Sequence, residues 1–255
     1  MVALLELKKV CMNFGKLQAC TDLDMTVNQG EILSLIGPNG AGKTTVFNVI
    51  TGTYRASGGN VIFKGEDITK MPPHKIAQRG ITRSFQQTFL FQWSTVLDNV
   101  LMGFHMKSSA GAFREFLHMP LARQKDKEAR EQALEIIDFM GLSAMKNELA
   151  GSLPHGHQRC LGVSIALASH PTLILLDEPV TGMNPTETLD MVDRIRKIRD
   201  RGMTIILVEH SMKVVMGISD RITVLNFGHK IAEGLPDEIK KNPDVIEAYL
   251  GKEGK

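Results

Sequence analysis

Eight residues, GPNGAGKT from Gly37 to Thr44, have the types and spacing that most directly predict chemistry in this sequence. They match the pattern G-x-x-x-x-G-K-[ST], whose glycines let the backbone curve tightly enough to turn successive N–H groups toward phosphate oxygens. In this pattern Lys43 neutralises the β- and γ-phosphates, Thr44 places its hydroxyl on Mg²⁺, and the following helix adds its positive N-terminal end. The segment therefore predicts that the chain binds a nucleoside triphosphate.

Two carboxylates end the apolar run LILLDEP, residues 173 to 179. Burying carboxylates beside such a run is costly unless a cation and a reacting water lie at the carboxyl end of the strand. Because adjacent strand positions point opposite ways, we expect Asp177 to face Mg²⁺ and Glu178 to polarise the attacking water as general base. The alternative is a solvated strand end without a catalytic role.

Another apolar run, TIILVEH, ends at His210, again at the carboxyl end of a predicted strand, where open α/β sheets present their ligand groups. A neutral imidazole in this place could hydrogen-bond the γ-phosphate or the attacking water and so report whether the third phosphate is present. A simple cap of the strand is the other interpretation, and the residues alone leave both open.

The stretch SLPHGHQRCLG, residues 152 to 162, places His155, His157 and Cys160 close enough together to raise the question of a metal site. Two observations argue against one. Residues two apart point to different faces of a helix, and closed zinc sites use four ligands where this stretch offers three candidates.

Apolar patterning predicts the elements that must position these residues. Alternation in LLELKKVCMNF and NVIFKGEDI indicates half-exposed antiparallel strands, whereas ILSLIG, LILLD and TIILVEH indicate fully buried ones. The run ILSLIG leads into the phosphate loop and then into the helix-like VFNVITG, which is the order that such a loop requires. From about Gly103 to Ala150 a charged, amphipathic helical pattern replaces the strands, which resume only after Pro171. This stretch is predicted to be a helical insertion into an α/β core.

The composition is that of an ordinary globular protein, with 43% hydrophobic and 23% charged residues and a formal net charge of +2 over 255 residues. Bulk charge gives no support to a polyanion-binding role. The three cysteines, at positions 11, 20 and 160, form no CxxC pair, so we expect reduced thiols in a cytosolic protein. Without a leader pattern or a run of about eighteen apolar residues, the chain is expected to be neither exported nor membrane-spanning by itself.

Five segments, GPNGAGKTT, ITRSFQQT, LILLDEP, TGMNP and VEH, together resemble in order and spacing the ATPase subunits of ABC transporters. The resemblance covers essentially the whole chain and implies a single ABC ATPase domain over residues 1–255. The implied fold is α/β, a P-loop NTPase with a RecA-like core, an N-terminal antiparallel β subdomain and an inserted α-helical subdomain. It assigns residues 1–88 and 165–255 to the nucleotide-binding core with its β subdomain, and residues 89–164 to the helical signature subdomain.

The resemblance also implies ATP and Mg²⁺ as the ligands and ATP hydrolysis as the activity. His210 matches the switch histidine of the family. Gln86 matches a loop glutamine that touches Mg²⁺ and water, with Gln87 as the competing candidate and a plain surface glutamine as the alternative. Phe14 matches the aromatic that stacks on adenine, with a core-facing strand residue as the alternative. The residues that match the phosphate loop are Gly37, Pro38, Asn39, Gly40, Ala41, Gly42, Lys43, Thr44 and Thr45.

The segment LPHGHQ lies where the family carries a signature of the form LSGGQ, which reaches the γ-phosphate held by the other subunit of a dimer. Pro154 stands in place of the serine, His155 of the first glycine and His157 of the glutamine, while Gly156 is kept. A proline leaves the following N–H groups available to an anion but has no hydroxyl for the phosphate. Pro154 and Gly156 are thus expected nucleotide contacts of an altered signature. Asn184, in TGMNP, replaces the aspartate of many relatives in a loop that approaches the partner subunit.

The long helical insertion, the GMNP loop and the tail IAEGLPDEIKKNPDVIEAYLG are similar to the ATPase subunits of importers for branched-chain amino acids and to their relatives for amides and urea. This resemblance implies a peripheral protein on the cytoplasmic face of the inner or plasma membrane. The implied partners are a second ABC ATPase subunit, in a homodimer or heterodimer, two permease subunits and an extracytoplasmic solute-binding protein, with no nucleic acid. The segment TFLFQWSTVLDNVLMG is the candidate groove for a permease helix, and a plain core segment is the alternative.

Two rival functions are an ABC-type soluble ATPase that acts on nucleic acid or ribosomes, and an export ATPase. The near-neutral charge, the single nucleotide site and the lack of coiled-coil or zinc insertions in the sequence argue against the first rival. The sequence contains nothing that identifies the transported substrate.

Overall fold

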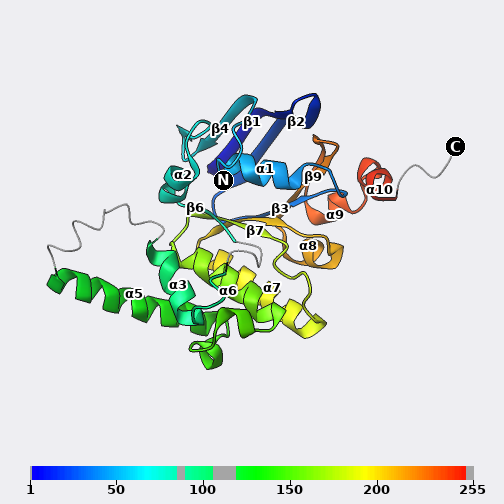
Figure 1. Cartoon of the computed structure of the whole chain (residues 1–255). Coiled ribbons are helices and arrows are strands. Elements are labelled where there is room, and N and C mark those ends of the chain that lie inside the picture. The colour runs from blue at the N-terminus through cyan, green and yellow to red at the C-terminus, as the bar shows by residue number, and fades with distance from the viewer. Residues whose placement is uncertain (1, 85–89, 106–118, 251–255) are drawn as a thin grey trace. The chain divides into compact units, whose positions relative to one another are not determined.

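The computed structural model describes residues 2–84, 90–105 and 119–250, and the structural statements below refer to these residues. The chain divides into two compact units, one made of residues 1–81 and 195–255 and the other of residues 82–194. Figure 1 shows the helices and strands of both. The division expected from the sequence, with the core at 1–88 and 165–255 and the helical part at 89–164, stays a prediction.

The first unit begins with a four-stranded antiparallel sheet. Its strands are β1 (Ala3–Phe14), β2 (Leu17–Asn28), β4 (Gly58–Phe63) and β5 (Glu66–Asp67), in the order β2-β1-β4-β5. Alternate residues of β2 are buried, among them Leu23, Met25 and Val27, as expected of a strand with one face on the core. The predicted antiparallel strands are confirmed, whereas β2 is not among the strands predicted from the sequence.

A second, mostly parallel set of strands in this unit has the order β10-β9-β3-β8. Here β3 (Ile32–Ile36) runs parallel to β8 (Thr204–Val208) and to β9 (Arg221–Asn226), and β10 (His229–Gly234) runs antiparallel to β9. All residues of β3 and β8 are buried, which is typical of parallel strands covered on both faces. Both strands confirm the predictions from continuous apolar runs.

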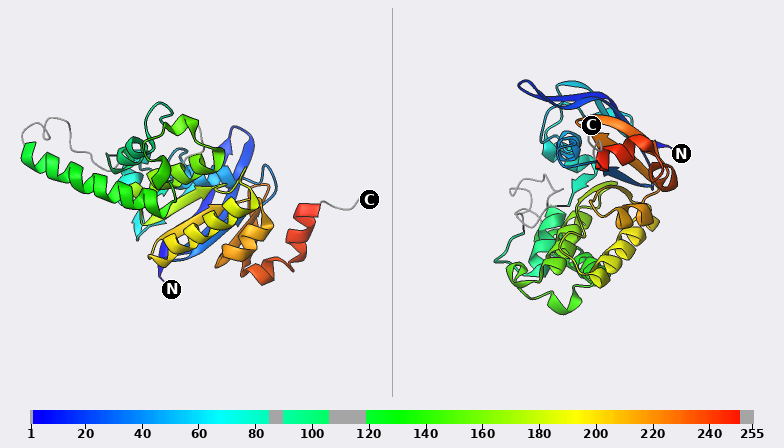
Figure 2. Two further views of the ribbon diagram at one scale, coloured as in Figure 1. Left: turned by 90° about the horizontal axis from the view of Figure 1, so that it is seen from below. Right: turned by 90° about the vertical axis from the view of Figure 1, so that its right-hand side faces the viewer.

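The helices of the first unit are α1 (Lys43–Ile50), α2 (Pro73–Arg79), α8 (Met212–Ile218), α9 (Pro236–Ile239) and α10 (Pro243–Leu250). In Figure 2 the last two, coloured orange to red, lie beside β9 and β10. Val245 of α10 belongs to a buried cluster with Ile36, the last residue of β3, and with Val215 of α8. The C-terminal helices are therefore part of the core that carries β3.

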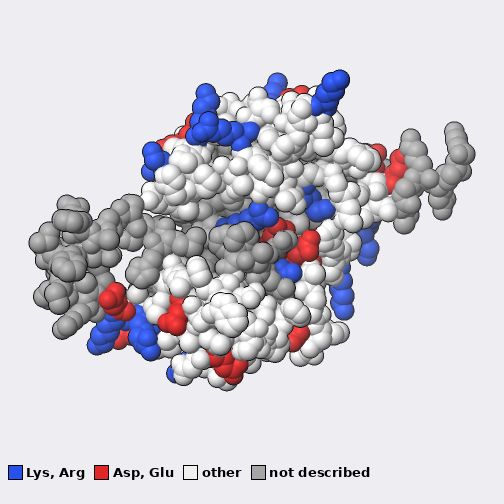
Figure 3. Space-filling view, in the orientation of Figure 1, with Lys and Arg blue, Asp and Glu red and all other residues white. Residues whose placement is uncertain are grey.

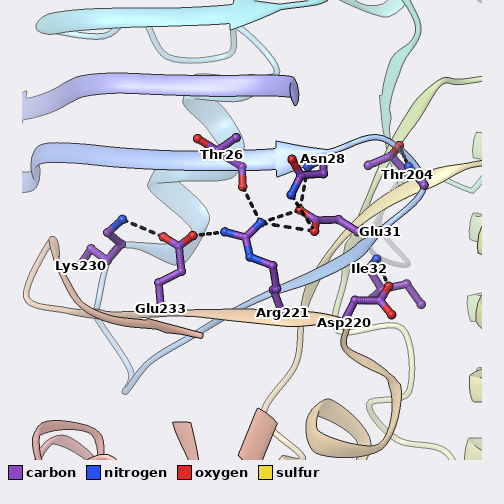
Figure 4. A network of polar contacts seen from close by, with 10 residues as sticks. Thr26, Asn28, Glu31, Ile32, Thr204, Asp220, Arg221, Lys230 and Glu233 are labelled. Atoms are coloured by element: carbon purple, nitrogen blue, oxygen red, sulfur yellow. Dashed lines mark hydrogen bonds and ion pairs between the residues drawn. The ribbon is translucent and has the colours of Figure 1, made fainter. Parts of the chain in front are cut away.

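Arg221, the first residue of β9, is the centre of a polar network (Figure 4). Its Nη1 donates to the carboxylate oxygens of Glu31 at 2.9 and 3.3 Å, and its Nη2 pairs with Glu233, which also accepts from Lys230 at 2.7 Å. Glu31, which is buried, in turn accepts from the backbone N–H of Asn28 at 2.7 Å. Because Glu31 precedes β3 and Arg221 begins β9, the network lies at the amino ends of these parallel strands. Its role is to hold the strands in place, since ligand groups of α/β sheets gather at the carboxyl ends.

The second unit contains β7 (Leu173–Asp177), which lies next to β6 (Ile81–Arg83), a strand that begins at the unit boundary. Its helices α3 (Val96–His105), α5 (Met119–Phe139) and α6 (His155–Ala168) pack on one another. Two 3₁₀ turns, Ser143–Met145 and Ala150–Ser152, follow α5, and α7 (Pro185–Asp200) belongs to this unit up to Arg194. The predicted helical insertion and the return of a buried strand after Pro171 are confirmed, and with them the α/β fold class.

Charged side chains of both signs lie along the described part of α5, the long helix at the lower left of Figure 1, as Figure 3 shows for the face in view. Lys127 and Glu131 form an i,i+4 pair there at 3.9 Å. Such mixed charge is typical of a solvated helix face. In the part of the chain that the structure describes, no helix is both long enough and apolar enough to cross a membrane.

Candidate nucleotide-binding and hydrolysis site

The predicted phosphate loop connects β3 to α1 in the first unit. Gly37 has φ +153°, and a Cβ there would lie 2.2 Å from the carbonyl oxygen of Leu225 in β9. Gly42 has φ +103°, and a Cβ there would lie 2.6 Å from the carbonyl oxygen of Ala19 in β2. Both positions therefore require glycine for space as well as for backbone conformation, which explains in physical terms the glycines of the sequence pattern.

Lys43, the first residue of α1, is buried and points back into the loop. Its Nζ donates to the carbonyl oxygens of Gly37 at 2.7 Å and Pro38 at 3.1 Å. Thr44 is exposed and Thr45 half-buried in the first turn of the same helix, where backbone N–H groups have no preceding helical carbonyl to bind. The loop thus combines a lysine ammonium, two hydroxyls and a helix N-terminus, the groups that bind a phosphate.

Backbone hydrogen bonds connect the phosphate loop to the turn after β9 and, through that turn, to β2. The N–H of Ala41 donates to the carbonyl of Pro38 at 3.1 Å, and the carbonyl of Ala41 accepts from Gly228, in the turn between β9 and β10, at 3.0 Å. Gly228 then accepts from the N–H of Thr21 in β2 at 2.9 Å. These bonds tie the loop to both sheets of the unit and keep its curve in place.

Phe14, at the end of β1, is 42% exposed. Its ring meets the edge of Tyr54 at a centroid distance of 5.2 Å and an interplanar angle of 80°. The ring is therefore half-open to solvent rather than core-facing, and the hairpin that carries it also carries Ala19, which lies against Gly42 of the loop. A role as an adenine platform stays a prediction that this geometry allows.

His210 follows β8, the parallel neighbour of β3, so it lies at the same carboxyl edge of the strands as the phosphate loop. Its side chain is exposed, and its backbone N–H donates to Glu209 Oε2 at 3.0 Å. Glu209 is buried, which is unusual for a carboxylate. The sequence pattern VEH predicts a role for His210 and none for Glu209.

In the second unit, Asp177 ends β7 and is 5% exposed. Arg83 Nη2 lies 2.5 Å from its Oδ2, and the Asp177 backbone N–H donates to Ser84 Oγ at 3.3 Å. The Arg83 guanidinium thus supplies the opposite charge that a buried carboxylate needs, and a carboxylate suits a residue that is predicted to meet a cation. The sequence alone does not identify Arg83, the basic residue of ITRSF, because its partner lies far along the chain.

Glu178 follows Asp177 with φ +50°, a left-handed conformation that is costly for a residue with a side chain. Its side chain is half-buried, and its Oε2 accepts from Thr181 Oγ1 at 3.3 Å. Glu178 thus lies just beyond the end of β7, whereas Asp177 is the last residue of the strand. This difference agrees with the predicted division of labour between the two carboxylates, which stays a prediction.

Asn184 caps α7. Its Oδ1 accepts from the backbone N–H groups of Thr186 and Glu187, both at 3.0 Å, and Glu187 Oε2 accepts from the Asn184 N–H at 2.9 Å. Asparagine is among the preferred residues for this reciprocal arrangement. Gly156 lies against the same glutamate, since a Cβ at Gly156 would lie 3.1 Å from Glu187 Cδ. The altered signature and the TGMNP loop are thus packed together within the second unit.

The signature segment begins α6, with Pro154 as its N-cap rather than within its first turn. His155 is exposed and His157 is half-buried, so the two rings lie in different environments. His157 Nδ1 is buried without a hydrogen-bond partner among the described residues.

Burial raises the pKa of the Cys160 thiol, an effect that the nearby Arg194 guanidinium partly opposes. Within the described ranges no group of three or more His, Cys, Asp or Glu side chains is placed to hold a metal ion.

Two groups of predicted positions remain, the loop glutamines and the apolar segment that follows them. Gln86 and Gln87 lie outside the described residues. In the segment that follows them, Phe91 and Trp93 are exposed, Trp93 by 90%, whereas Val96 and Val100 of α3 are buried. The two interpretations of this segment therefore apply to different parts of it: an exposed apolar stretch first, then core.

Comparison with known proteins gives a consistent result. The family model described as "ABC transporter" matches residues 20–181, and the model described as "Branched-chain amino acid ATP-binding cassette transporter" matches residues 229–255. The chain is 41% identical to the high-affinity branched-chain amino acid transport ATP-binding protein BraF of Pseudomonas aeruginosa and 42% identical to LivG of Salmonella typhimurium, over 98% of both chains in each case.

The solved structures that match this chain are also ATP-binding cassettes of ABC transporters. A nucleotide-free ATP-binding cassette from an ABC transporter matches with a TM-score of 0.87 at 32% identity, over 98% of this chain and 100% of that one. The ADP conformation of the cassette MJ1267 matches with a TM-score of 0.86 at 30% identity, over 99% and 100% of the two chains.

Proposed function

We propose that this chain, which belongs to the ABC transporter family, is the subunit that binds and hydrolyses ATP for an importer of branched-chain amino acids or of related small amides or urea. ATP hydrolysis is the activity of the family. One observation carries the choice of importer: the chain matches branched-chain amino acid transport proteins over nearly its full length, including a C-terminal segment with its own family model.

The phosphate loop binds ATP through its backbone N–H groups, Lys43 and the N-terminus of α1. In the described structure two carbonyl groups hold the Lys43 ammonium, and a phosphate is a stronger acceptor because it carries charge. Lys43 is therefore expected to turn from these carbonyls to the β- and γ-phosphates. Phe14 is expected to receive the adenine ring, since its side chain is partly exposed at the end of β1.

The donor set fits a hard cation. Asp177 is a buried carboxylate that pairs with the Arg83 guanidinium, and Thr44 offers an exposed hydroxyl at the start of α1. Mg²⁺ prefers such oxygen ligands and, when bound, neutralises phosphate charge in the transition state. Thr44, Asp177 and Gln86 are the residues that would hold it, and Arg83 would have to release Asp177.

Hydrolysis requires a base for the attacking water. Glu178 supplies it in this proposal, because it lies just beyond the end of β7 and is only half-buried. His210 is expected to hydrogen-bond the γ-phosphate or the water from the end of β8. Gln86 is expected to contact both Mg²⁺ and the water.

The chain is expected to work in a dimer on the cytoplasmic face of the membrane, with two permease subunits and an extracytoplasmic solute-binding protein. Each ATP would lie between one subunit's phosphate loop and the other subunit's signature, so Pro154 and Gly156 would contact the nucleotide of the partner. The exposed Phe91 and Trp93, two residues apart just before α3, support docking of a permease helix there, since exposed large apolar side chains can mark interaction sites.

The rival functions fit less well. A nucleic-acid-binding ATPase would be expected to carry a basic patch, whereas the net charge is +2 and the face in Figure 3 shows both signs. An export ATPase is less favoured because the relatives that match over 98% of both chains are high-affinity branched-chain amino acid transport ATP-binding proteins.

The test is co-expression with neighbouring permease and solute-binding protein genes, followed by purification of the complex. We expect ATP turnover to rise when the binding protein carries leucine, isoleucine or valine, and less so with urea or a small amide. Trp93 is the single tryptophan, so its emission should shift to shorter wavelength on assembly, and Trp93→Phe removes that signal. Co-purification with ribosomes or nucleic acid, and turnover indifferent to the binding protein, would contradict the proposal.

A further inference from the structure

Glu209 is a buried carboxylate at the carboxyl edge of the parallel strands. It follows β8 directly and is 3% exposed, although glutamate is among the residues that are rarely buried completely. Taking a carboxylate out of water is costly, so a buried one needs a role that offsets the cost. The chemistry proposed for this edge assigns a task to the next residue, His210, but none to Glu209.

The strand register places both residues beside the start of the phosphate loop. β8 runs parallel to β3, with Leu207 paired to Ser34. Continued by three residues along each strand, this register places His210 level with Gly37, the first residue of the loop. A small change in the direction of the backbone after Glu209 would therefore move the His210 ring relative to the loop that is proposed to hold the phosphates.

The Glu209 side chain is hydrogen-bonded to the backbone of its neighbour. Its Oε2 accepts the N–H of His210 at 3.0 Å. This bond restrains the peptide plane between the two residues, because the carboxylate is held in the buried region below it. The His210 side chain, in contrast, is exposed. A buried acceptor thus sets the direction in which the exposed imidazole leaves the backbone.

The backbone on the other side of His210 is also fixed. Ser211 is the N-cap of α8, and its carbonyl accepts the N–H of Val215 at 3.0 Å. Val215 belongs to the buried cluster that contains Ile36, the last residue of β3. Only three residues separate β8 from α8, so the connection that carries His210 is short and is held at both ends.

We propose, on the basis of the hydrolytic role proposed for His210, that Glu209 is a positioning residue that holds the imidazole in the direction from which it reaches the γ-phosphate or the attacking water. A hydrogen bond to an ionised acceptor is roughly twice as strong as one between neutral groups. A carboxylate therefore holds this peptide unit more firmly than an amide of the same shape would, which offsets the cost of its burial.

The test compares Glu209→Leu, which removes the acceptor, with Glu209→Gln, which keeps an acceptor oxygen without the charge. Hydrogen exchange of the His210 amide is measured by NMR in the nucleotide-free full-length chain. We expect about ten- to hundredfold faster exchange in Glu209→Leu, the range for a lost bond to a charged acceptor, and a smaller increase in Glu209→Gln. Asp237→Asn, which neutralises an exposed carboxylate on α9, is the control and should leave this exchange unchanged.

ATP turnover of the assembled transporter is the second measurement. Glu209→Leu should lower turnover by about ten- to hundredfold, since a displacement of about 1 Å at a reacting site can cost that much, and Glu209→Gln should lower it less. ADP affinity should stay within twofold, because ADP lacks the phosphate that His210 is proposed to contact. A general disturbance of this edge would weaken ADP binding as well, since the phosphate loop lies beside it. Melting temperatures of the variants check that the fold is kept.

Unchanged exchange of the His210 amide in Glu209→Leu, or equal exchange in the two Glu209 variants, would overturn the inference. His210→Ala separates this inference from the proposed function. If His210→Ala hydrolyses ATP normally, the role proposed for His210 is wrong, and the exchange result still decides whether Glu209 positions it. If His210→Ala loses turnover but Glu209→Leu keeps it, or if Glu209→Leu weakens ADP binding as much as it lowers turnover, the inference alone is wrong.

Discussion

Lys43 is the residue on which nucleotide affinity is expected to depend most. It is buried and held by the Gly37 and Pro38 carbonyl groups, so it is already directed into the loop before phosphate arrives. Lys43→Ala should abolish tight ATP binding, because a phosphate in the loop would lose its lysine cation there. Calorimetry on the isolated chain measures this loss, with Lys240→Ala, an exposed lysine beyond α9, as the control. An ATP affinity like that of the unsubstituted chain would refute the assignment.

Glu178 is expected to control hydrolysis without controlling binding. Its left-handed backbone conformation and half-buried carboxylate set it apart from Asp177, which remains in the line of β7. Glu178→Gln should keep ATP binding and slow turnover by roughly 10²- to 10⁴-fold, the usual contribution of a positioned general base. ATP should then trap the closed dimer.

The measurement is steady-state ATP turnover of the assembled transporter, accompanied by nucleotide binding to the same preparation. Asp190→Asn, which neutralises an exposed carboxylate on α7, serves as the matched control and should leave turnover unchanged. Unchanged turnover in Glu178→Gln would exclude this residue as the base.

At the scale of elements, continuous apolar runs predicted β3, β7 and β8 well, because strands buried on both faces need no alternation to be recognised. The strands β2, β6, β9 and β10 were missed. β2 has polar residues at half its positions, and β10 has no residue in the buried class, so neither presents a continuous apolar run. Both are strands because they pair with a neighbour, β2 with β1 and β10 with β9, and no local sequence pattern indicates this pairing.

The candidate site was predictable where its residues lie next to one another in the sequence. The spacing of glycines, Lys43 and Thr44 within one segment is enough to identify the loop, since local backbone geometry dictates it. Arg83 could not be found in this way. Its partner, Asp177, lies far along the chain, and only the fold brings the two residues together.

The Arg221 network is expected to stabilise the first unit without affecting chemistry, because it lies at the amino ends of β3 and β9. Arg221→Met should lower the free energy of unfolding by about 2–4 kcal/mol, since it leaves the buried Glu31 without its cation. Arg221→Met combined with Glu31→Gln should recover part of that loss.

Urea denaturation of the single and double variants measures both effects. Nucleotide affinity of the folded protein should remain within twofold of the unsubstituted chain. A stability loss in the double variant equal to the sum of the two single losses would show that the pair is not coupled, contrary to what Figure 4 implies.

At the scale of the whole molecule, the altered signature is expected to affect the ATP sites of the working dimer. If each composite site joins one subunit's phosphate loop to the other's signature, the changes at Pro154, His155 and His157 affect the ATP held by the partner. This chain has the residue types of the family at the positions expected to act on its own ATP, namely Lys43, Asp177, Glu178 and His210. The signature of the partner would complete that site. In a heterodimer whose partner has a complete signature, most hydrolysis should therefore occur on this chain's phosphate loop.

A homodimer would place the altered signature in both sites. Pro154 caps α6 but has no hydroxyl, so activity would depend on the backbone N–H groups near Gly156. His155, which is exposed, offers a rival explanation, because a ring N–H can donate to phosphate much as a hydroxyl does. His157 is a weaker candidate, since its ring is half-buried and its Nδ1 is enclosed.

The two ATP sites of the working dimer are therefore expected to be unequal, and separate substitution of the two general bases tests this. The catalytic glutamate is changed to glutamine first in this chain, at Glu178, and then in the partner, and ATP turnover of each assembled transporter is compared. Large loss in the first complex with near-normal turnover in the second is the expected result. His155→Ala in the unsubstituted complex is the accompanying control, because a loss of turnover there would show that the imidazole replaces the missing hydroxyl. Equal losses from the two glutamate substitutions would contradict the asymmetry.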